Sequence, residues 1–478
     1  KNSVLKQDLE PYAEKIIQYF DEQNGGFKGA PKFPQFYVFD TIFYFYKKKN
    51  DKKFLKPVEK LLNNISSKGI YDQLEGGIAR YTVDDKWIVP HFEKMLYDNI
   101  LYVNLLNQFI QKEKSSYLEN KLKQTINFIN SEFLSENGLL GSAYDADSEG
   151  IEGKYYIWKY DEIKNYLKDK FEIFSKKYLI TKEGNFEGSN ILVENKDNKL
   201  TDEELNKAKD AENILLIERK KRIKPFFDNK VQTDLNCYWL YSNLYSSLIL
   251  NDQELYKKTV SSINHINEKL KDNVFHCYNK KNQEIDVFLE DYVYYSLLLI
   301  TLYEINNDKI SLEKCEKKME DAWRLFFNKE NNLLQKNILK SNDLFVQPID
   351  IADNNIPNGN SIYLLICRKL SNITNKKLWS EKIDILNKSF HTFMNYNFSQ
   401  MFSYVKILDI CEENITVTLH GKINEKLKNE ILTKFMGNIS IIYKENDQDS
   451  FVVICKSQTC SEKLKDLNQI NEYIKNNL

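Results

Sequence analysis

The feature that most constrains the fold of this chain is a turn followed by a short extended segment, which recurs after successive helical stretches. The copies are rich in Asn, Asp and Gly, residues that suit tight turns. They begin at Asn24, Glu75, Asn137, Asp272 and Asn331. Their spacing indicates a period of roughly 55 to 60 residues, with one interval covering two periods. Each unit therefore has room for one helical hairpin and its loop, and six units fill roughly the first 400 residues.

Six helical hairpins can stack as an open solenoid or close into a ring. Solenoid repeats are usually shorter and have uniform loops, whereas the loops of this chain are long, aromatic and chemically different from one another. We therefore predict a mainly α protein, an (α/α)6 toroid over residues 1–410. In such a ring the loops meet at one mouth and form a single acidic, aromatic pocket.

Apolar residues at helical spacing predict the individual helices. They are expected at residues 5–20, 36–48, 53–66, 92–111, 117–133, 161–167, 201–219, 234–250, 253–270, 287–305 and 312–327. After Cys411 the pattern changes, and alternating apolar residues predict strands at 415–419, 439–443 and 451–455. With helices expected at 424–435 and 461–474, residues 411–478 are predicted to form a small α/β region.

Charge and cysteine content limit the partners and the compartment. The 68 Lys and Arg residues nearly balance the 69 Asp and Glu residues, so the chain has no strong field to attract nucleic acid or an anionic membrane. No apolar run approaches the roughly 18 residues of a membrane span. Seven scattered cysteines predict a reducing compartment, the cytoplasm. Cys455 and Cys460 lack the spacing of a dithiol redox site and are expected to be buried or idle thiols. The first residue is Lys, so we expect a longer natural protein.

Residues 75–99, EGGIARYTVDDKWIVPHFEKMLYDN, form the densest cluster of polar and aromatic side chains. The Gly-Gly pair turns the chain, a short strand is predicted to follow, and Pro90 is expected to open a helix, where its missing N–H costs nothing. In that helix His91, Lys94 and Asp98 would share one side. The alternative is that the histidine bonds a loop carbonyl and the nearby glutamate favours the helix N-terminus, with no catalytic role.

A second cluster lies in residues 138–158, where four carboxylates are close in sequence: Asp145, Asp147, Glu149 and Glu152. Their spacing imitates the start of a calcium loop, but Tyr156 stands where the loop needs a bidentate Glu, so no metal is predicted. Two interpretations stay open. The carboxylates can form a solvated hairpin tip, or they can serve as acid, base or acceptor for sugar hydroxyls.

Three further segments are predicted to lie at the starts of helices, at residues 225–230, 288–292 and 357–361. Helix capping explains much of their Asp, Asn and Ser content. Their register, however, is that of successive toroid units, which favours a shared pocket. The sequence has no phosphate-binding loop, dinucleotide fingerprint or Ser-His-Asp signature, so no cofactor is predicted.

Six motifs together resemble a known family, the thioredoxin-domain proteins that include spermatogenesis-associated protein 20. They are GGFKGAPKFP at 25–34, the 75–99 stretch, SAYDADSEGIEGKYYIW at 142–158, GNFEGSNIL at 184–192, FLEDY at 288–292 and PNGNS at 357–361. The resemblance implies an N-terminal thioredoxin-like domain, which is absent from this sequence. It also implies a toroid similar to the N-acylglucosamine 2-epimerases and six-hairpin glycosidases, and a small C-terminal region. A thioredoxin-like domain, upstream or in trans, is thus a candidate partner.

The chain departs from the family pattern at three places. It has Asp228-Asn229-Lys230 where the family has two consecutive Asp, and Asp234-Leu235 where the family has Ser-Trp. Near residues 396–400, Asn-Phe-Ser-Gln replaces a segment that ends in histidine. Epimerases of this fold are expected to use two histidines, and only His91 lies in a family motif, so the resemblance disfavours epimerase chemistry.

Two functions remain open. The first is a carbohydrate- or polyol-processing enzyme in which aromatic rings stack on the ligand and carboxylates and a histidine move protons. Its catalytic candidates are His91, Glu93, Asp145, Asp147 and Asp291. Its substrate-binding candidates are Arg80, Tyr81, Trp87, Lys94, Tyr97, Asp98, Tyr156, Trp158, Asn190, Asp228, Lys230, Glu290, Asn358 and Asn360. The second is a non-catalytic binding or scaffold module that works with a thioredoxin-like domain; thiol redox chemistry is a minor third.

Overall fold

The structure, a computed structural model, describes residues 8–277, 287–338, 351–445 and 447–478. By its internal contacts the chain separates into two compact units. Unit 1 comprises Lys1–Lys15, Tyr44–Asn50 and Gln232–Leu478, and unit 2 comprises Ile16–Phe43 and Asp51–Val231. Each unit is described by itself below. Among the described residues, no helix is long and apolar enough to cross a membrane.

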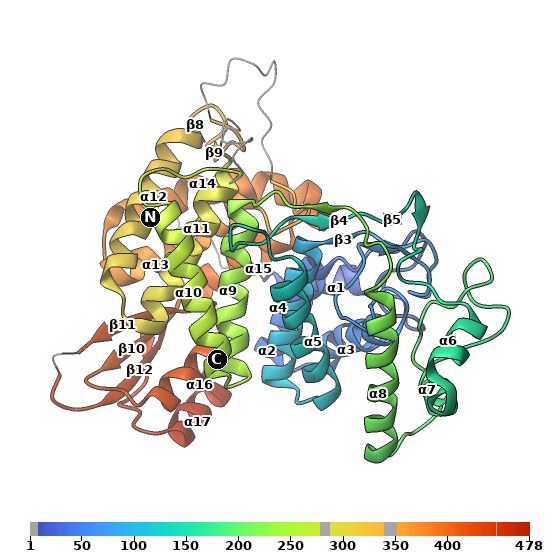
Figure 1. Cartoon of the computed structure of the whole chain (residues 1–478). Coiled ribbons are helices and arrows are strands. Elements are labelled where there is room, and N and C mark those ends of the chain that lie inside the picture. The colour runs from blue at the N-terminus through green and yellow to red at the C-terminus, as the bar shows by residue number, and fades with distance from the viewer. Residues whose placement is uncertain (1–7, 278–286, 339–350, 446) are drawn as a thin grey trace. The chain divides into compact units, whose positions relative to one another are not determined.

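Unit 1 is built from helical hairpins (Figure 1). Its main helices are α9 (Thr233–Ile249), α10 (Gln253–Lys269), α11 (Leu289–Asn306), α12 (Lys309–Phe326), α13 (Gly359–Thr374), α14 (Lys377–Asn397) and α15 (Phe402–Glu413). The odd-numbered helices pack on one another in order, and each of α9, α11 and α13 also packs on the helix that follows it. The short segments β8 (Phe327–Asn328), β9 (Leu333–Leu334) and η2 (Phe398–Gln400) complete this part.

The sequences of these helices explain why one helix of a hairpin is buried and the other covers it. Helix α11 reads LEDYVYYSLLLITLYEIN, and it is buried on nearly every side from Val293 to Ile305. Helix α12, in contrast, buries a single stripe that includes Cys315, Met319 and Ala322. A helix that is apolar all round belongs inside, and an amphipathic one covers it. The inner helices therefore present their N-terminal ends next to one another.

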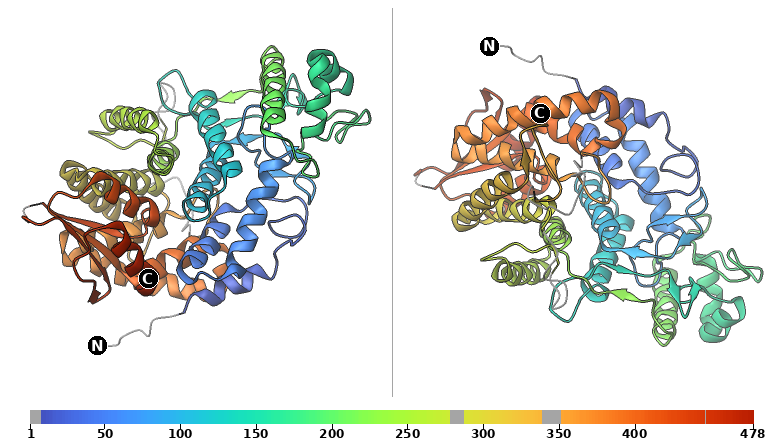
Figure 2. Two further views of the ribbon diagram at one scale, coloured as in Figure 1. Left: turned by 90° about the horizontal axis from the view of Figure 1, so that it is seen from below. Right: turned by 90° about the horizontal axis from the view of Figure 1, so that it is seen from above.

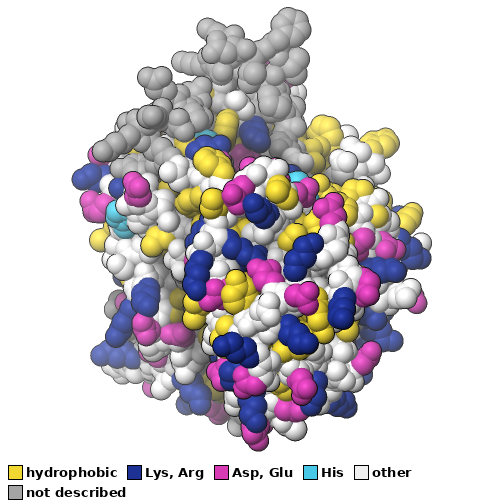
Figure 3. Space-filling model, turned by 45° about the vertical axis from the view of Figure 1, so that its right-hand side comes forward, with side chains coloured by type: hydrophobic (Ala, Val, Ile, Leu, Met, Phe, Trp, Pro, Cys, Tyr) yellow, Lys and Arg dark blue, Asp and Glu magenta, His cyan; other side chains and the backbone are white. Residues whose placement is uncertain are grey.

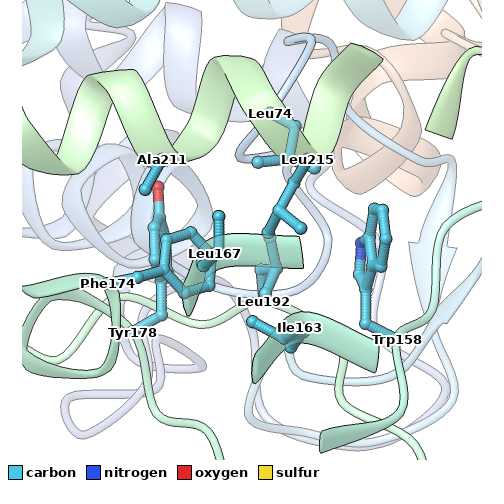
Figure 4. Packing of buried hydrophobic residues seen from close by; sticks show 9 residues of the cluster. All are labelled: Leu74, Trp158, Ile163, Leu167, Phe174, Tyr178, Leu192, Ala211 and Leu215. Carbon is cyan, nitrogen blue, oxygen red and sulfur yellow. The ribbon is translucent and has the colours of Figure 1, made fainter. Parts of the chain in front are cut away.

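Unit 2 contains α3 (Lys52–Ser67), α4 (Leu96–Lys112), α5 (Ser116–Glu132), α6 (Tyr160–Leu167), η1 (Lys168–Lys170), α7 (Phe171–Lys177) and α8 (Asp202–Arg219), while α1 (Glu10–Ile17) and α2 (Phe36–Lys49) have residues in both units. Helices α6 and α7 pack on α8 through a buried cluster (Figure 4). Trp158, Ile163 and Phe174 meet Leu215 from α8 in this cluster. The cluster fixes the loops that run between these helices.

Short strands join the loops of unit 2. They are β1 (Tyr81–Thr82), β2 (Pro90–His91), β3 (Lys94–Met95), β4 (Ala143–Tyr144), β5 (Asp147–Ser148), β6 (Ile151–Glu152) and β7 (Phe227–Asp228). Strand β1 pairs with β2, β5 pairs with β6, and β4 lies between β3 and β7. These pairings bring the 75–99 stretch, the 138–158 hairpin and the 225–230 segment to one sheet, although they are far apart in the sequence.

The recurring turn is confirmed. In four of the five copies the extended residue after the turn pairs with a residue before it, as in Phe20 with Phe27 and Tyr71 with Ile78. After the turn at Asp272, Cys277 pairs instead with Gln232. Asparagines from the next helix hold two of these segments. Asn99 Oδ1 accepts the N–H of Ile78 at 2.8 Å, and its amide donates to the same residue's carbonyl. Asn360 binds Leu334 in the same way, at 2.9 and 2.8 Å. Gly77 has φ +79°, and a Cβ there would collide with Phe128.

Most predicted helices are present within a few residues, but three predictions are wrong. Pro90 does not open a helix, because it pairs with Thr82 in β2 and the chain is not helical before Leu96, where α4 begins. His91 and Lys94 therefore lie on strands, not on one side of a helix with Asp98. Residues 461–466 precede α17 and are not helical. The first helix begins at Glu10, and residues 5–7 of its predicted range lie outside the described residues.

The predicted α/β region at the C-terminal end is also present (Figure 2, red). It consists of β10 (Ile415–His420), α16 (Glu425–Phe435), β11 (Ser440–Lys444), β12 (Phe451–Lys456), β13 (Thr459–Cys460) and α17 (Leu467–Asn477). The sheet order is β11-β10-β12-β13, and the parallel β10–β11 pair is joined through α16, as a parallel crossover requires. Cys455 and Cys460 form a disulfide, so the expectation of idle thiols is wrong.

Candidate active site

The N-terminal ends of α9 and α11 bring two carboxylates and a histidine together in unit 1. Asp234 lies in the first turn of α9, Asp291 lies in the first turn of α11, and His276 lies in the loop after α10. One ligand atom of each side chain lies within 4.8 Å of the others. The loop is held beside α9 because the N–H of Thr233 donates to the carbonyl of His276 at 3.0 Å.

Asp291 is the fixed centre of this group and is fully buried. Its Oδ2 accepts the N–H of Phe288 at 2.8 Å, and its Oδ1 accepts the N–H of Asp234 at 3.3 Å. Both oxygens also lie 3.1 Å from Nδ1 of His276. This contact assigns the proton to Nδ1, because the carboxylate can only accept. The ring packs edge-on against Phe288, and its Nε2 lies 3.4 Å from the amide nitrogen of Gln232.

Glu290 is next to Asp291 and carries an unsatisfied polar atom. Its Oε2 is buried and has no hydrogen-bond partner. Its Oε1 lies against Gly359, where an added Cβ would approach to 2.8 Å. The Glu290 carboxyl therefore occupies space that only a glycine at the start of α13 leaves open. In the same turn Asn358 caps α13 by accepting the N–H of Ser361 at 3.3 Å.

The environment raises the pKa values of three of these groups. Burial, and then the charge of Asp291, raise the pKa of Asp234 to about 7. Burial raises the pKa of Glu290 to about 7, against the opposing effect of Lys336. Burial lowers the pKa of His276, but its hydrogen bond to Asp291 and the surrounding carboxylates outweigh burial and raise it. Groups that titrate near neutral pH can both take and return a proton.

Asp234, His276 and Asp291 are also the residues of the described chain that could hold a metal ion. The spacing of 3.1 Å between His276 and Asp291 is that of a hydrogen-bonded ion pair, however, and metal ligation would need the imidazole nitrogen free of its proton. We therefore interpret the group as an acid–base cluster.

In unit 2, strands β1 and β2 display a second set of predicted residues. The Tyr81 ring stacks between Phe33 and His91, at centroid distances of 4.7 and 5.1 Å. Both faces of Tyr81 are therefore covered. His91 Nδ1 lies 2.7 Å from Oε1 of Glu152 on the β5–β6 hairpin. Arg80 and Glu93 form a looser pair at 3.6 Å, and Tyr97 and Asp98 lie just after them at the start of α4.

Other predicted residues are exposed. Asp145 and Asp147 lie on the solvent side of the β5–β6 hairpin, and Asp145 Oδ1 accepts the N–H of Ala146 at 2.7 Å. Asp228 is paired with Lys230 at 3.0 Å. On the face shown in Figure 3, acidic and basic side chains are likewise mixed and form no large patch of one sign, as the net charge of −1 predicts.

Several predicted binding residues are held inside the protein. Trp87 is fully buried, and its indole N–H donates to the carbonyl of Asn24 at 3.0 Å. Asn190 binds the backbone N–H and carbonyl of Thr181 at 3.0 and 2.9 Å. Trp158 is buried in the cluster of Figure 4. These side chains hold the loops of unit 2 in place.

Lys94 and Tyr156 line a small cavity in unit 2. Lys94 donates to Asp72 at 2.7 Å, and Asp72 also receives two hydrogen bonds from Arg219, both at 2.9 Å. The cavity holds about 30 Å³, which is room for about two water molecules and not for a sugar. This network is a buried ion cluster that joins α8 to the turn before β1.

Comparison with known proteins identifies the relatives of the chain. No family model matches the sequence. An uncharacterised protein of Caenorhabditis elegans, B0495.5, is 24% identical over 95% of this chain and 71% of its own length. Human spermatogenesis-associated protein 20 is 22% identical over 95% of this chain and 67% of its own length. The chain is a homologue of spermatogenesis-associated protein 20. This agrees with the resemblance that the sequence motifs carry.

Homology to spermatogenesis-associated protein 20 is accompanied by a likeness in fold to solved enzymes. Cellobiose 2-epimerase from Bacillus thermoamylovorans matches 80% of this chain and 84% of its own, with a TM-score of 0.52 at 12% identity. A D-mannose isomerase matches the same shares with a TM-score of 0.50 at 10% identity. These comparisons confirm the predicted fold class, the helical-hairpin toroid of sugar epimerases. At such low identity they show the fold and no more.

Two residues of the acid–base cluster, His276 and Asp234, are not among the candidates that the sequence motifs predict. His276 lies in no family motif, and Asp234 was noted only as a departure from the pattern. A signal was nevertheless present. Asp234 and Asp291 are 57 residues apart, which is one period of the predicted repeat, so both occupy the first turn of successive inner helices.

Proposed function

We propose that this protein is a carbohydrate- or polyol-processing enzyme that moves protons through Asp234, His276 and Glu290, with Asp291 positioning His276. The observation that carries the proposal is the pair of half-buried His276 and fully buried Asp291 beside two carboxyls whose pKa values are about 7. The likeness in fold to a cellobiose epimerase and a mannose isomerase supports the class of substrate.

The roles follow from the geometry. Asp291 is a positioning residue, because it holds Nδ1–H of His276 and fixes the ring. His276 then presents Nε2 as acid or base. Glu290, with its free buried Oε2, supplies a second group that can donate or accept a proton. Epimerisation or isomerisation next to a carbonyl needs one group to remove a proton and a group to return it, and this set provides both.

The test uses deuterium uptake from solvent. Purified protein is incubated in D2O with cellobiose and, separately, with D-mannose, and NMR follows loss of the proton on the carbon next to the carbonyl. We expect exchange with the wild type and its loss in His276→Gln. His420→Gln is the matched control, because His420 forms a similar exposed pair with Asp447 in the C-terminal region. Metal content is measured in the same samples.

Exchange that survives in His276→Gln, or a wild type that exchanges neither sugar, would contradict the proposal. Exchange that is abolished by a chelator and restored by a divalent cation would instead assign the three side chains to a metal site. The catalytic and binding residues of the loop in unit 2, His91 and Glu93 among them, remain proposals that the same assay can test by substitution.

A second candidate function is a binding or scaffold module. The observation in its favour is that Trp87, Trp158 and Asn190 are built into the interior of unit 2 and offer nothing to a small ligand. Such a module would work with a thioredoxin-like domain, as the sequence resemblance implies. Isothermal titration of this chain with a separately produced thioredoxin-like domain of a relative tests it, and absence of binding excludes it.

A further inference from the structure

Two neighbouring side chains at the start of α4 carry buried polar atoms to which no protein group makes a well-formed hydrogen bond, although Arg80 approaches the hydroxyl of Tyr97. They are Oη of Tyr97 and Oδ2 of Asp98. Tyr97 is 6% exposed and Asp98 is 9% exposed. Buried polar atoms without partners are uncommon because each loses its bonds to water without replacement. Two of them on consecutive residues indicate a place where the missing partner is a ligand group.

Local structure explains why the protein does not satisfy these atoms itself. Helix α4 begins without a side-chain cap at Met95, and the next polar residue, Asn99, is committed to Ile78 and Met95. The charged groups that act on Asp98 are Arg80 and Glu93. They form a pair only 3.6 Å apart, and their side chains are 38% and 28% exposed. The cluster is thus buried at its base and open at its charged rim.

We propose that Tyr97 and Asp98, with the Arg80–Glu93 pair at the rim, form a binding subsite for the hydroxyl groups of a neutral polyhydroxy ligand. This proposal specifies the class of ligand for the proposed carbohydrate function, and to that extent it rests on the proposed function. It belongs to unit 2 and does not include the acid–base cluster of unit 1.

The chemistry of the cluster favours hydroxyl groups over anions. Burial raises the pKa of Asp98 well above its ordinary range, against the opposing effect of Arg80, and this favours the protonated carboxyl, a group that can both donate and accept. The Tyr97 hydroxyl can also do both. A ligand hydroxyl has the same double capacity and matches them. An anionic ligand would only accept, and it would meet the carboxylate of Glu93 beside the one cation, Arg80, that the rim provides.

The experiment measures binding without turnover. D-glucose, a neutral polyol, and D-gluconate, its carboxylate counterpart, are titrated into the full chain and followed by saturation-transfer NMR. We expect glucose to bind more tightly than gluconate. Tyr97→Phe should weaken glucose binding by about five- to tenfold, which is the worth of one hydrogen bond. Asp98→Leu should abolish it, whereas Asp98→Asn, which is neutral and keeps both a donor and an acceptor, should retain it within about twofold.

Asp161→Asn, an exposed carboxyl on α6 of the same unit, is the matched control and should bind as the wild type does. Thermal unfolding of each variant separates loss of fold from loss of binding. The subsite is refuted if gluconate binds more tightly than glucose, if glucose does not bind, or if folded Asp98→Leu binds like the wild type. Binding that depends on Tyr97 and Asp98 without any proton exchange would keep the subsite and reject the proposed reaction.

Discussion

Nδ1 of His276 lies 3.1 Å from both carboxylate oxygens of Asp291, and Asp291 is fully buried. Because the carboxylate is also held by the N–H groups of Phe288 and Asp234, it cannot turn away from the imidazole. The pair therefore keeps one tautomer and one ring orientation. This is the feature that separates the cluster from a set of ordinary helix caps, each of which would bind only its own backbone.

Asp291→Asn should lower the pKa of His276. Burial alone lowers that pKa, and the hydrogen bond and charge of Asp291 are the largest of the effects that raise it. With the charge removed, the burial effect prevails. An NMR titration of the histidine ring protons in the wild type and the variant measures the change. An unchanged pKa would mean that the pair does not control the ring.

Stability should fall as pH rises from about 4 to about 7 through Asp234 and Glu290. Their folded pKa values, about 7, lie above the ordinary 3.8 and 4.5, so the folded protein holds more protons than the unfolded chain in this window. The contribution of these groups to the free energy of unfolding is fully present below their ordinary pKa values. It is lost as pH rises through their pKa values in the folded protein. Asp234→Asn should flatten this dependence by on the order of 1 to 3 kcal/mol. Urea unfolding of the wild type and of Asp234→Asn at each pH measures the free energy of unfolding. An equal dependence of that free energy on pH in the two proteins would contradict the prediction.

Gly359→Ala should disturb Glu290 specifically. The new Cβ would lie 2.8 Å from Oε1 of Glu290 and 3.2 Å from the Leu289 side chain. We expect a loss of about 1 to 3 kcal/mol in unfolding free energy. Glu290→Ala removes the obstructing carboxyl, so the double variant should lose less than the sum of the single variants. If the losses of the two single variants simply add in the double variant, residues 359 and 290 are not in contact.

Asn99→Ala should destabilise unit 2 by about 2 to 4 kcal/mol, because it leaves the N–H and carbonyl of Ile78 buried without their partner. Asn104→Ala is the matched control on the same helix, since Nδ2 of Asn104 is buried and makes no hydrogen bond. Asn104→Ala should lose clearly less unfolding free energy than Asn99→Ala. Chemical denaturation of both variants decides, and equal losses would reject the bridging role.

Much of the fold could be predicted because it depends on local pattern. Helices α2, α3 and α8 to α12 begin and end within a few residues of the expected positions, since their apolar spacing is regular. Pro90 does not start a helix, because β pairing with Thr82, which is a contact outside the local pattern, overrides the helix preference. The turn before β1 was predicted because consecutive glycines are typical of tight turns that need positive φ angles.

The site was harder to predict than the fold. Trp87 and Trp158 have the composition of a sugar-binding surface, but only packing reveals that they are buried. His276 has no carboxylate near it in sequence, and its partner is 15 residues away on another element. The pairing of His276 with Asp291 depends on the β-bridge between Gln232 and Cys277. No sequence pattern predicts that bridge. Asp291, in contrast, was found because it belongs to a helix start that the repeat predicts.

The central claim is that His276 moves a proton on a carbohydrate substrate. The most direct measurement is the rate of deuterium incorporation from D2O into cellobiose or D-mannose by the wild type and by His276→Gln. The variant should be slower by at least about a hundredfold while remaining folded, since a general acid or base contributes about that much or more. Equal rates in the two proteins would contradict it.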